Sequence, residues 1–324
     1  NNVIKDNVFD GKWGPNQGYR TFEASTKCRT GNSPTGGNVG YNLIENNVFK
    51  NTMPGPSGGR PRPKALKLEG TGQIFRKNFV YNNDFTAIGG GVRRGDSDGM
   101  SKVKIYNNVF YNNGMLFRFS DRGLVAPAGT DQNVFKNNIV YASKESTLVL
   151  ADVLISSQNA GNSPLNKHIF THNAFKQQSA SVSIDYTGIG NHALSWYEAN
   201  YPSNFNNNFD IVPDFIASNP AVPEDFQLRP NSPLIDAGDF LTKTRSAGSG
   251  KKVAVHDAGY FSDGFGIVDG DHVKIGSNTP VRIIQVDYDT NTITLEYRIA
   301  WDRNDRVSLP FNGDAPDVGA FEQQ

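Results

Sequence analysis

Apolar residues and asparagines recur together along the first two thirds of this 324-residue chain. Each copy is a polar pair ending in Asn, followed by one to three apolar residues. Successive copies lie 40, 31, 30, 30, 35 and 35 residues apart. A short, apolar unit repeated at this distance indicates units that stack and bury their apolar faces on their neighbours. The recurring asparagines are Asn7, Asn47, Asn78, Asn108, Asn138, Asn173 and Asn208.

The segment 85–114 shows what one repeat contains. Residues 85–89 form a short extended run, and a polar, Gly-rich loop follows at 90–99. Residues 102–106 alternate polar and apolar side chains, which predicts a half-buried strand. Asn107 and Asn108 predict a corner, because Asn tolerates left-handed backbone angles. A third strand at 109–111 completes three strands per repeat.

Three short strands per repeat predict an all-β fold, a parallel β-helix. Stacked strands are spaced about 4.8 Å apart. Asn side chains at the same corner of successive repeats would then form a ladder of amide hydrogen bonds. We therefore interpret the repeated Asn residues as architectural.

The chain resembles the right-handed parallel β-helix proteins of the pectin-lyase-like superfamily, which carry an Asn ladder between their second and third strands. Segment 194–198 looks like the short helix that follows the last regular coils in many secreted bacterial members. Segments 212–215, 225–238 and 317–322 look like their C-terminal signature. The resemblance implies a β-helix over 1–238, a short helix near 194–200, and a return to the β-helix cap at 317–324. It also implies a secreted protein, extracellular or on the cell surface.

Residues 239–316 carry a different pattern of short alternating strands. Residues 289–291 predict a hairpin turn between two of them. We interpret this region as a small antiparallel barrel or sandwich inserted into the C-terminal cap. We expect it to close the open end of the β-helix and block edge-to-edge pairing, although sugar binding is an alternative.

The overall charge of the chain bears on which partners it can attract. Lys and Arg number 32, as do Asp and Glu, so no net field favours nucleic acid. No apolar run approaches the roughly 18 residues that span a bilayer, so we expect no membrane insertion. The single cysteine, Cys28, allows no disulfide within the chain. We expect a monomer, with self-association as an alternative.

The first residues of the chain indicate whether the stack of repeats has an N-terminal cap. Residues 1–4 already belong to a repeat, and no cap precedes them. Terminal repeats normally need a cap. We therefore expect N-terminal coils to be missing from this sequence.

A candidate site follows from aligning the first strand of each repeat. Side chains alternate along a strand. One outward row is therefore predicted to contain Glu23, Lys67, Ala87 and Arg118. Two long cations over a floor of small residues would suit a polyanionic sugar. The flanking residues predicted to bind substrate are Glu23, Glu69, Arg93, Arg94, Asp121 and Arg122.

The chemistry expected of this row is β-elimination on a polysaccharide that contains uronic acid. Lys67 would act as general base, with a pKa lowered by neighbouring Arg residues. Arg118 would offset the substrate carboxylate or assist the leaving oxygen. Glu69 could orient Lys67. This pairing looks like that of chondroitinase B and related alginate lyases, although their signature segments around the base and acid are not recognisable here.

Several alternatives remain open from the sequence. Lys67 and Arg118 could belong to an ordinary solvated face. A uronate epimerase would begin with the same proton abstraction, and a glycoside hydrolase would use clustered carboxylates instead. A non-catalytic surface, filament or adhesin-like protein is the alternative from another class. We expect no cofactor, or Ca²⁺, for which Asp96 and Asp98 are weak candidates.

Overall fold

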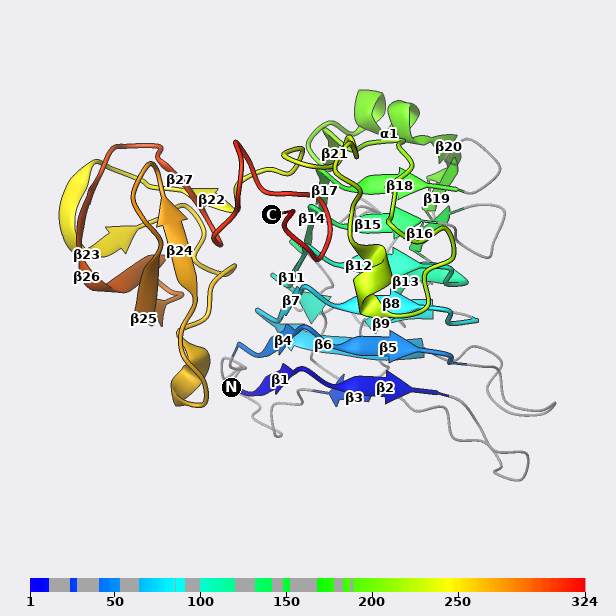
Figure 1. Ribbon diagram of the computed structural model, residues 1–324, viewed down its shortest axis with the longest axis horizontal. Coiled ribbons are helices and arrows are strands. Elements are labelled where there is room, and N and C mark those ends of the chain that lie inside the picture. Colours follow the sequence, from blue (N-terminus) through cyan, green and yellow to red (C-terminus); the bar gives the residue numbers. More distant parts are fainter. Residues whose placement is uncertain are drawn as a thin grey trace, which may run out of the picture.

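The computed structural model describes residues 1–11, 24–27, 41–52, 64–84, 86–90, 100–119, 132–141, 148–151, 168–177, 183–186 and 189–323. Within these residues the protein is mostly strand. Figure 1 shows the repeats stacked from β1 and β2 at one end to β17 and β18 at the other, with a separate group of strands beside the stack. The prediction of an all-β fold is confirmed.

Two parallel sheets run along the stack, and each repeat supplies one strand to each. Sheet A, in spatial order, consists of β1 (Val3–Lys5), β4 (Leu43–Glu45), β7 (Ile74–Arg76), β11 (Lys104–Tyr106), β14 (Val134–Lys136), β17 (Ile169–Thr171) and β21 (Phe205–Asn206). Sheet B consists of β2 (Val8–Asp10), β5 (Val48–Lys50), β8 (Phe79–Tyr81), β12 (Val109–Tyr111), β15 (Ile139–Tyr141) and β18 (Ala174–Lys176).

A third parallel sheet, sheet C, is formed by the strands that follow sheet B in each repeat. Its strands are β3 (Ala24–Lys27), β6 (Lys64–Thr71), β9 (Thr86–Gly90) and β13 (Met115–Phe119), with the short β10 (Met100–Ser101) paired to β6. A further three-stranded sheet holds β16 (Leu148–Ala151), β19 (Ser183–Tyr186) and β20 (Gly190–Ala193). Helix α1 (Leu194–Asn200) follows β20, in the segment where the sequence predicted a helix.

The corner between sheets A and B has the same conformation in every described repeat. The corner residue takes a positive φ between 51° and 60°, a conformation that Asn and Asp adopt more readily than most residues. The next residue is the ladder Asn. The corner residues are Asp6, Asn46, Lys77, Asn107, Asn137, His172 and Asn207.

The ladder Asn side chains are joined from one repeat to the next. Each Nδ2 donates to the Oδ1 of the following ladder Asn at 2.9–3.1 Å, from Asn7 through to Asn208. The interior members are almost fully buried, and their amides also donate to backbone carbonyls, as Asn78 does to Ile44. Buried polar groups need such partners. The ladder therefore provides hydrogen-bond partners for the buried polar groups at the corner, and it holds the repeats in register.

The interior of the stack is apolar. The middle residue of each strand in sheets A and B points inward, as Phe75 and Ile105 do in sheet A and Val80 and Phe110 in sheet B. Aromatic rings stack between repeats, and the centroids of Phe135 and Phe170 lie 4.6 Å apart. This burial of one face per strand is the main stabilising term for the stack.

The C-terminal sheet is antiparallel and six-stranded, which confirms this part of the prediction. In spatial order it consists of β22 (Thr242–Lys243), β27 (Arg306–Ser308), β24 (His272–Ile275), β25 (Val281–Asp287), β26 (Thr292–Trp301) and β23 (Gly248–Ala254). Residues 288–291 connect β25 to β26 as the predicted hairpin. Two short 3₁₀ helices, η1 (Pro223–Phe226) and η2 (Gly264–Gly266), lie in the connecting segments.

The C-terminal sheet packs beside the stack rather than over its end (Figure 1). Leu43, Ile74 and Val134 on the outer face of sheet A belong to the same apolar cluster as Val273 and Ile293 of the C-terminal sheet. The expectation that this region closes an open end was therefore wrong. The expectation of a half-buried strand at 102–106 was wrong for the same reason, because the neighbouring sheet buries β11 on both faces.

Sheet B is covered as well. Phe215, Phe226, Leu234 and Val318 pack on its outer face. The C-terminal tail is held by the corners of the stack, since the Asn107 side chain donates to the carbonyls of Asp317 and Gly319 at 3.1 Å each.

Candidate functional site

Sheet C brings the two predicted catalytic residues onto one register row. Ser25 pairs with Lys67, Lys67 pairs with Gly89, and Gly89 pairs with Arg118. Two strand spacings therefore separate Lys67 from Arg118, about 10 Å at the backbone. The residue between them is a glycine.

The row predicted from sequence was displaced by two residues at two of its positions. Ala87 had been aligned with Lys67 and Arg118, but Gly89 occupies that position, and Ser25 stands where Glu23 had been placed. A shift of two residues leaves every side chain on the same face of the strand. The alternation of apolar residues therefore could not distinguish the two registers.

The inward side of this sheet agrees with the prediction. Leu66, Leu68 and Ile88 are buried, each no more than 1% exposed. Ile184 of β19 is buried too, and it pairs with Leu148 of β16. The predicted inward side chains are thus confirmed where they are described. The outward position predicted for Ala87 was wrong, because Ala87 is fully buried in the same interior cluster.

Most flanking candidates fall outside the described residues. Glu69 lies on β6, where its Cα pairs with that of Lys27. The structure describes the backbone but not the side chains of Lys67, Glu69 and Arg118. The candidates that lie outside the described ranges are Glu23, Arg93, Arg94, Asp96, Asp98, Asp121 and Arg122.

Sheet A carries a buried set of charges that the sequence did not reveal. The Arg76 guanidinium donates to both carboxylate oxygens of Asp271, at 2.7 and 2.5 Å, and to Glu45 at 2.9 Å. It also donates to the Tyr106 hydroxyl at 3.0 Å. Burial alone would lower the pKa of Arg76, but the neighbouring Asp271 carboxylate raises it well above its usual value. This arginine is therefore charged and fully engaged in holding the two sheets together.

Two lysines of the next repeats repeat this arrangement. Lys104 Nζ lies 2.6 Å from an Asp257 carboxylate oxygen, and Lys136 Nζ lies 2.7 Å from one of Asp239. Burial lowers the pKa of Lys136, and the Asp239 carboxylate acts in the opposite direction. Three successive repeats thus each contribute one cation to an aspartate of the C-terminal region. Residues 103 to 195 positions apart in sequence form these pairs, so no local motif signals them.

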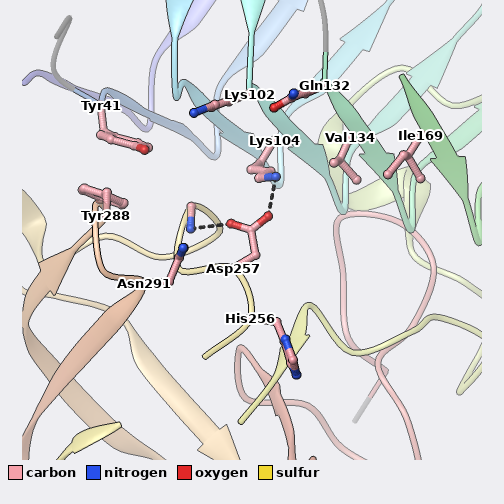
Figure 2. Close-up of a pocket in the computed structure, with 11 residues that line it drawn as sticks. Tyr41, Lys102, Lys104, Gln132, Val134, Ile169, His256, Asp257, Tyr288 and Asn291 are labelled. Atoms are coloured by element: carbon pink, nitrogen blue, oxygen red, sulfur yellow. Dashed lines mark hydrogen bonds and ion pairs between the residues drawn. The ribbon is translucent and has the colours of Figure 1, made fainter. Parts of the chain in front are cut away.

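A cleft of about 440 Å³ lies beside Lys104, between sheet A and the C-terminal sheet. Figure 2 shows Lys102 and Gln132 on one side of this cleft and His256, Asp257 and Asn291 on the other. The remaining lining residues include two tyrosines whose rings stack, with centroids 3.4 Å apart, and two apolar side chains. These are Tyr41, Tyr288, Val134 and Ile169.

Comparisons with protein-family models, curated proteins and solved structures found no match for this chain. None of the helices in the described part of the chain is long and apolar enough to cross a membrane. Within the same residues, no cluster of three or more His, Cys, Asp or Glu side chains is arranged to hold a metal ion.

Proposed function

We propose that the protein is a secreted right-handed parallel β-helix protein that binds an acidic polysaccharide along sheet C and cleaves it by β-elimination. The observation that carries this proposal is the register row Lys67–Gly89–Arg118. The β-helix part is supported by the in-register parallel pairing of sheets A, B and C in successive repeats. The resemblance of the C-terminal signature supports secretion.

The location of the proposed groove follows from what covers the other faces. The outer faces of sheets A and B pack against the C-terminal sheet and the segment that contains Phe215 and Phe226. The described apolar residues of sheet C belong to the interior cluster instead. Leu66 and Leu68 flank Lys67 and are buried, so alternation between them assigns Lys67 to the opposite face of the strand. The alternation breaks one residue earlier, where Ala65 is buried beside Leu66.

The proposed reaction needs a base and a countercharge that act on the same sugar unit, and long side chains such as Lys and Arg can meet there from backbones about 10 Å apart. Lys67 would take the proton from the carbon beside the uronate carboxylate, while Arg118 offsets the charge that develops on that carboxylate. The electron pair of the broken C–H bond forms a carbon–carbon double bond, and the glycosidic oxygen leaves from the adjacent carbon. Arg suits this role because it stays charged and can bind a carboxylate through two hydrogen bonds.

Gly89 contributes by lacking a side chain. At the position between Lys67 and Arg118, any larger residue would occupy the space that a sugar ring must enter. The row therefore combines two cations with a gap of one strand between them. A polyanionic glycan is the partner that this arrangement of two cations favours.

The test is an ultraviolet assay for unsaturated uronate. The purified protein is incubated with alginate, pectate, chondroitin sulfate, dermatan sulfate, heparin and ulvan, with and without Ca²⁺. Lys67→Ala and Arg118→Ala are measured beside Lys64→Ala, a matched control on the same strand in a different register row. We expect absorbance to rise with one polymer, and both site variants to abolish it while the control retains it.

The alternatives give different outcomes. An epimerase would exchange the sugar proton with solvent and leave no unsaturated product. A rise in absorbance that survives both site substitutions would place the lyase site elsewhere. Absence of cleavage and exchange, together with unchanged glycan binding in both variants, would favour the non-catalytic surface protein and overturn the proposed row.

A further inference from the structure

The cleft between sheet A and the C-terminal sheet contains polar groups with unused bonding capacity. Within the described part of the chain, the side chains of Lys102, Gln132 and His256 make no hydrogen bond or ion pair. Asn291 uses its Oδ1 to accept the backbone N–H of Ala258 at 2.9 Å, which leaves its Nδ2 donors free. Lys102, Gln132 and Asn291 line one hollow, whereas the ring of His256, at its edge, points away from them (Figure 2).

The backbone holds these groups in place. Lys102 and Gln132 occupy the same turn position in successive repeats, two residues before the sheet A strand, and both have a φ of 54°. They therefore lie about 4.8 Å apart at the backbone, one strand spacing. On the opposite wall, Asn291 is fixed by its bond to Ala258 and by its position in the β25–β26 hairpin.

The central ion pair sets the charge of the cleft. Asp257 is held by Lys104 at 2.6 Å and by the Gly259 N–H at 2.8 Å, so its carboxylate is already matched. Lys102 adds a second cation, which is exposed. Two positive groups and one negative group leave one positive charge for a ligand to neutralise.

The remaining walls suit a sugar. Val134 and Ile169 supply an apolar strip along one side, on which the C–H face of a pyranose ring can rest. The stacked pair Tyr41 and Tyr288 closes one end. The volume of about 440 Å³ lies within the range of small-ligand sites, roughly 300–1,000 Å³. Amide groups around such a ring can bind hydroxyls while a lysine binds a single carboxylate.

We infer that this cleft is a second carbohydrate site, separate from sheet C, that binds a single-charged uronate unit. Lys102 binds the carboxylate, and Gln132 and Asn291 bind the hydroxyls. The inference stands whether or not the protein cleaves polysaccharide, because it concerns binding on a different face of the stack.

The experiment uses the full chain carrying Lys67→Ala and Arg118→Ala, so that binding on sheet C does not contribute. Methyl groups of Val and Ile are ¹³C-labelled, and D-glucuronate, D-galacturonate and neutral methyl glucoside are titrated separately. We expect saturable shifts of the Val134 and Ile169 signals with at least one uronate, and binding at least tenfold weaker for the neutral sugar.

Three variants test the assignment of roles. Lys102→Ala should weaken uronate binding tenfold or more, while Lys252→Ala, an exposed lysine of β23, should leave it unchanged. Asn291→Asp keeps the acceptor for the Ala258 N–H but replaces the free donor with a negative charge, so it should weaken binding further. An unchanged methyl spectrum with both uronates would overturn the inference, as would Lys102→Ala binding with wild-type affinity.

This outcome is distinguishable from failure of the proposed function. The ultraviolet assay reports on cleavage of the polymer, and the Val134 and Ile169 methyl signals report on binding in the cleft. Loss of uronate binding on raising ionic strength would be expected for a site that depends on one exposed lysine.

Discussion

The guanidinium of Arg76 binds the carboxylate of Asp271 through two hydrogen bonds across 195 residues of sequence. The two side chains are 2% and 8% exposed. The pair therefore lies in the interface that joins the stack to the C-terminal sheet. Its geometry is bidentate, which gives directional specificity as well as attraction.

Removing one partner of this pair should destabilise the protein strongly. Asp271→Ala leaves the Arg76 charge buried with Glu45 as its remaining carboxylate partner. Breaking a buried pair in this way costs about 3–5 kcal/mol. The free energy of unfolding, measured in urea, should fall by that amount.

The matched comparisons are a double variant and an exposed pair. Arg76→Met with Asp271→Leu removes both charges, so it should cost less than Asp271→Ala alone. Arg282→Ala breaks an exposed pair with Glu296 in the same sheet and should cost least. Equal losses of unfolding free energy in Asp271→Ala and Arg282→Ala would show that the buried pair stabilises the protein no more than the exposed pair does.

The middle of the Asn ladder should matter far more than its exposed end. Asn108 Oδ1 accepts both the N–H and the Nδ2 of Asn78. Asn108→Ala therefore leaves the buried Asn78 N–H without an acceptor, while its Nδ2 keeps the carbonyls of Ile44 and Arg76. Each unsatisfied group costs about 1–3 kcal/mol. Asn7→Ala, at an exposed position, should cost no more than about 1 kcal/mol. Chemical denaturation of both variants checks this, and similar losses would contradict it.

Gly72 is required by its neighbour Tyr41 as well as by its backbone angle, a φ of 73°. Lys102 and Gln132 adopt a positive φ at the corresponding turns, but a Cβ at position 72 would lie 2.5 Å from the Tyr41 ring. Gly72→Ala should therefore displace Tyr41 from its stack on Tyr288 and cost about 1–3 kcal/mol.

A double-mutant cycle tests that cause. With Tyr41→Ala already present, the additional change Gly72→Ala should cost much less than it does in the wild-type protein. The free energies of unfolding of all four proteins give the coupling. If Gly72→Ala lowers the free energy of unfolding equally in the Tyr41→Ala background, the destabilisation comes from backbone strain and not from the Tyr41 ring.

Stability should fall as pH rises towards 8, because of Glu322. Burial, with a smaller effect of the Asp317 and Asp236 charges, raises the pKa of this carboxyl to about 8 against the opposing Asp317 N–H and Lys77 charge. The unfolded chain releases the same proton near its ordinary value of 4.5. Between these two values the folded protein binds more protons than the unfolded chain, so the free energy of unfolding decreases with rising pH.

Glu322→Gln isolates this contribution. The amide oxygen can still accept the Asp317 N–H, but the side chain no longer titrates. The decline between pH 4.5 and 8 should become shallower in the variant, as measured by urea denaturation at several pH values. Asp317, whose pKa burial also raises, should account for part of the remaining slope. Parallel pH profiles for the variant and wild type would exclude Glu322 as the source.

Local patterns predicted the all-β class, the corners and the antiparallel C-terminal sheet. The spacing of Asn78, Asn108 and Asn138 was enough to predict the stacked repeats and their corners, because each repeat folds on its immediate neighbours. The hairpin at 288–291 also depended on nearby residues alone. The right-handed β-helix that these features favour stays a proposal.

Register and long-range docking could not be predicted in the same way. Ala87 and Gly89 are two residues apart on one strand, so a period-two apolar pattern alone cannot choose between them. Arg76 finds Asp271 only after the C-terminal sheet has folded onto the stack, and no periodicity connects the two residues. Lys67 and Arg118 share a register row, but their catalytic roles stay predictions.

The Asn ladder has a direction, and Glu198 ends it. Each amide donates towards the next repeat, and at Asn208 both the N–H and Nδ2 donate to the Glu198 carboxylate, at 2.8 and 3.2 Å. An ionised carboxylate accepts hydrogen bonds but has none to donate, so this end offers no donor to a further amide. The ladder can therefore be extended only from its Asn7 side, and a second copy stacked beyond Asn208 would first have to displace Glu198. Helix α1, which carries Glu198, therefore caps this end of the stack of repeats.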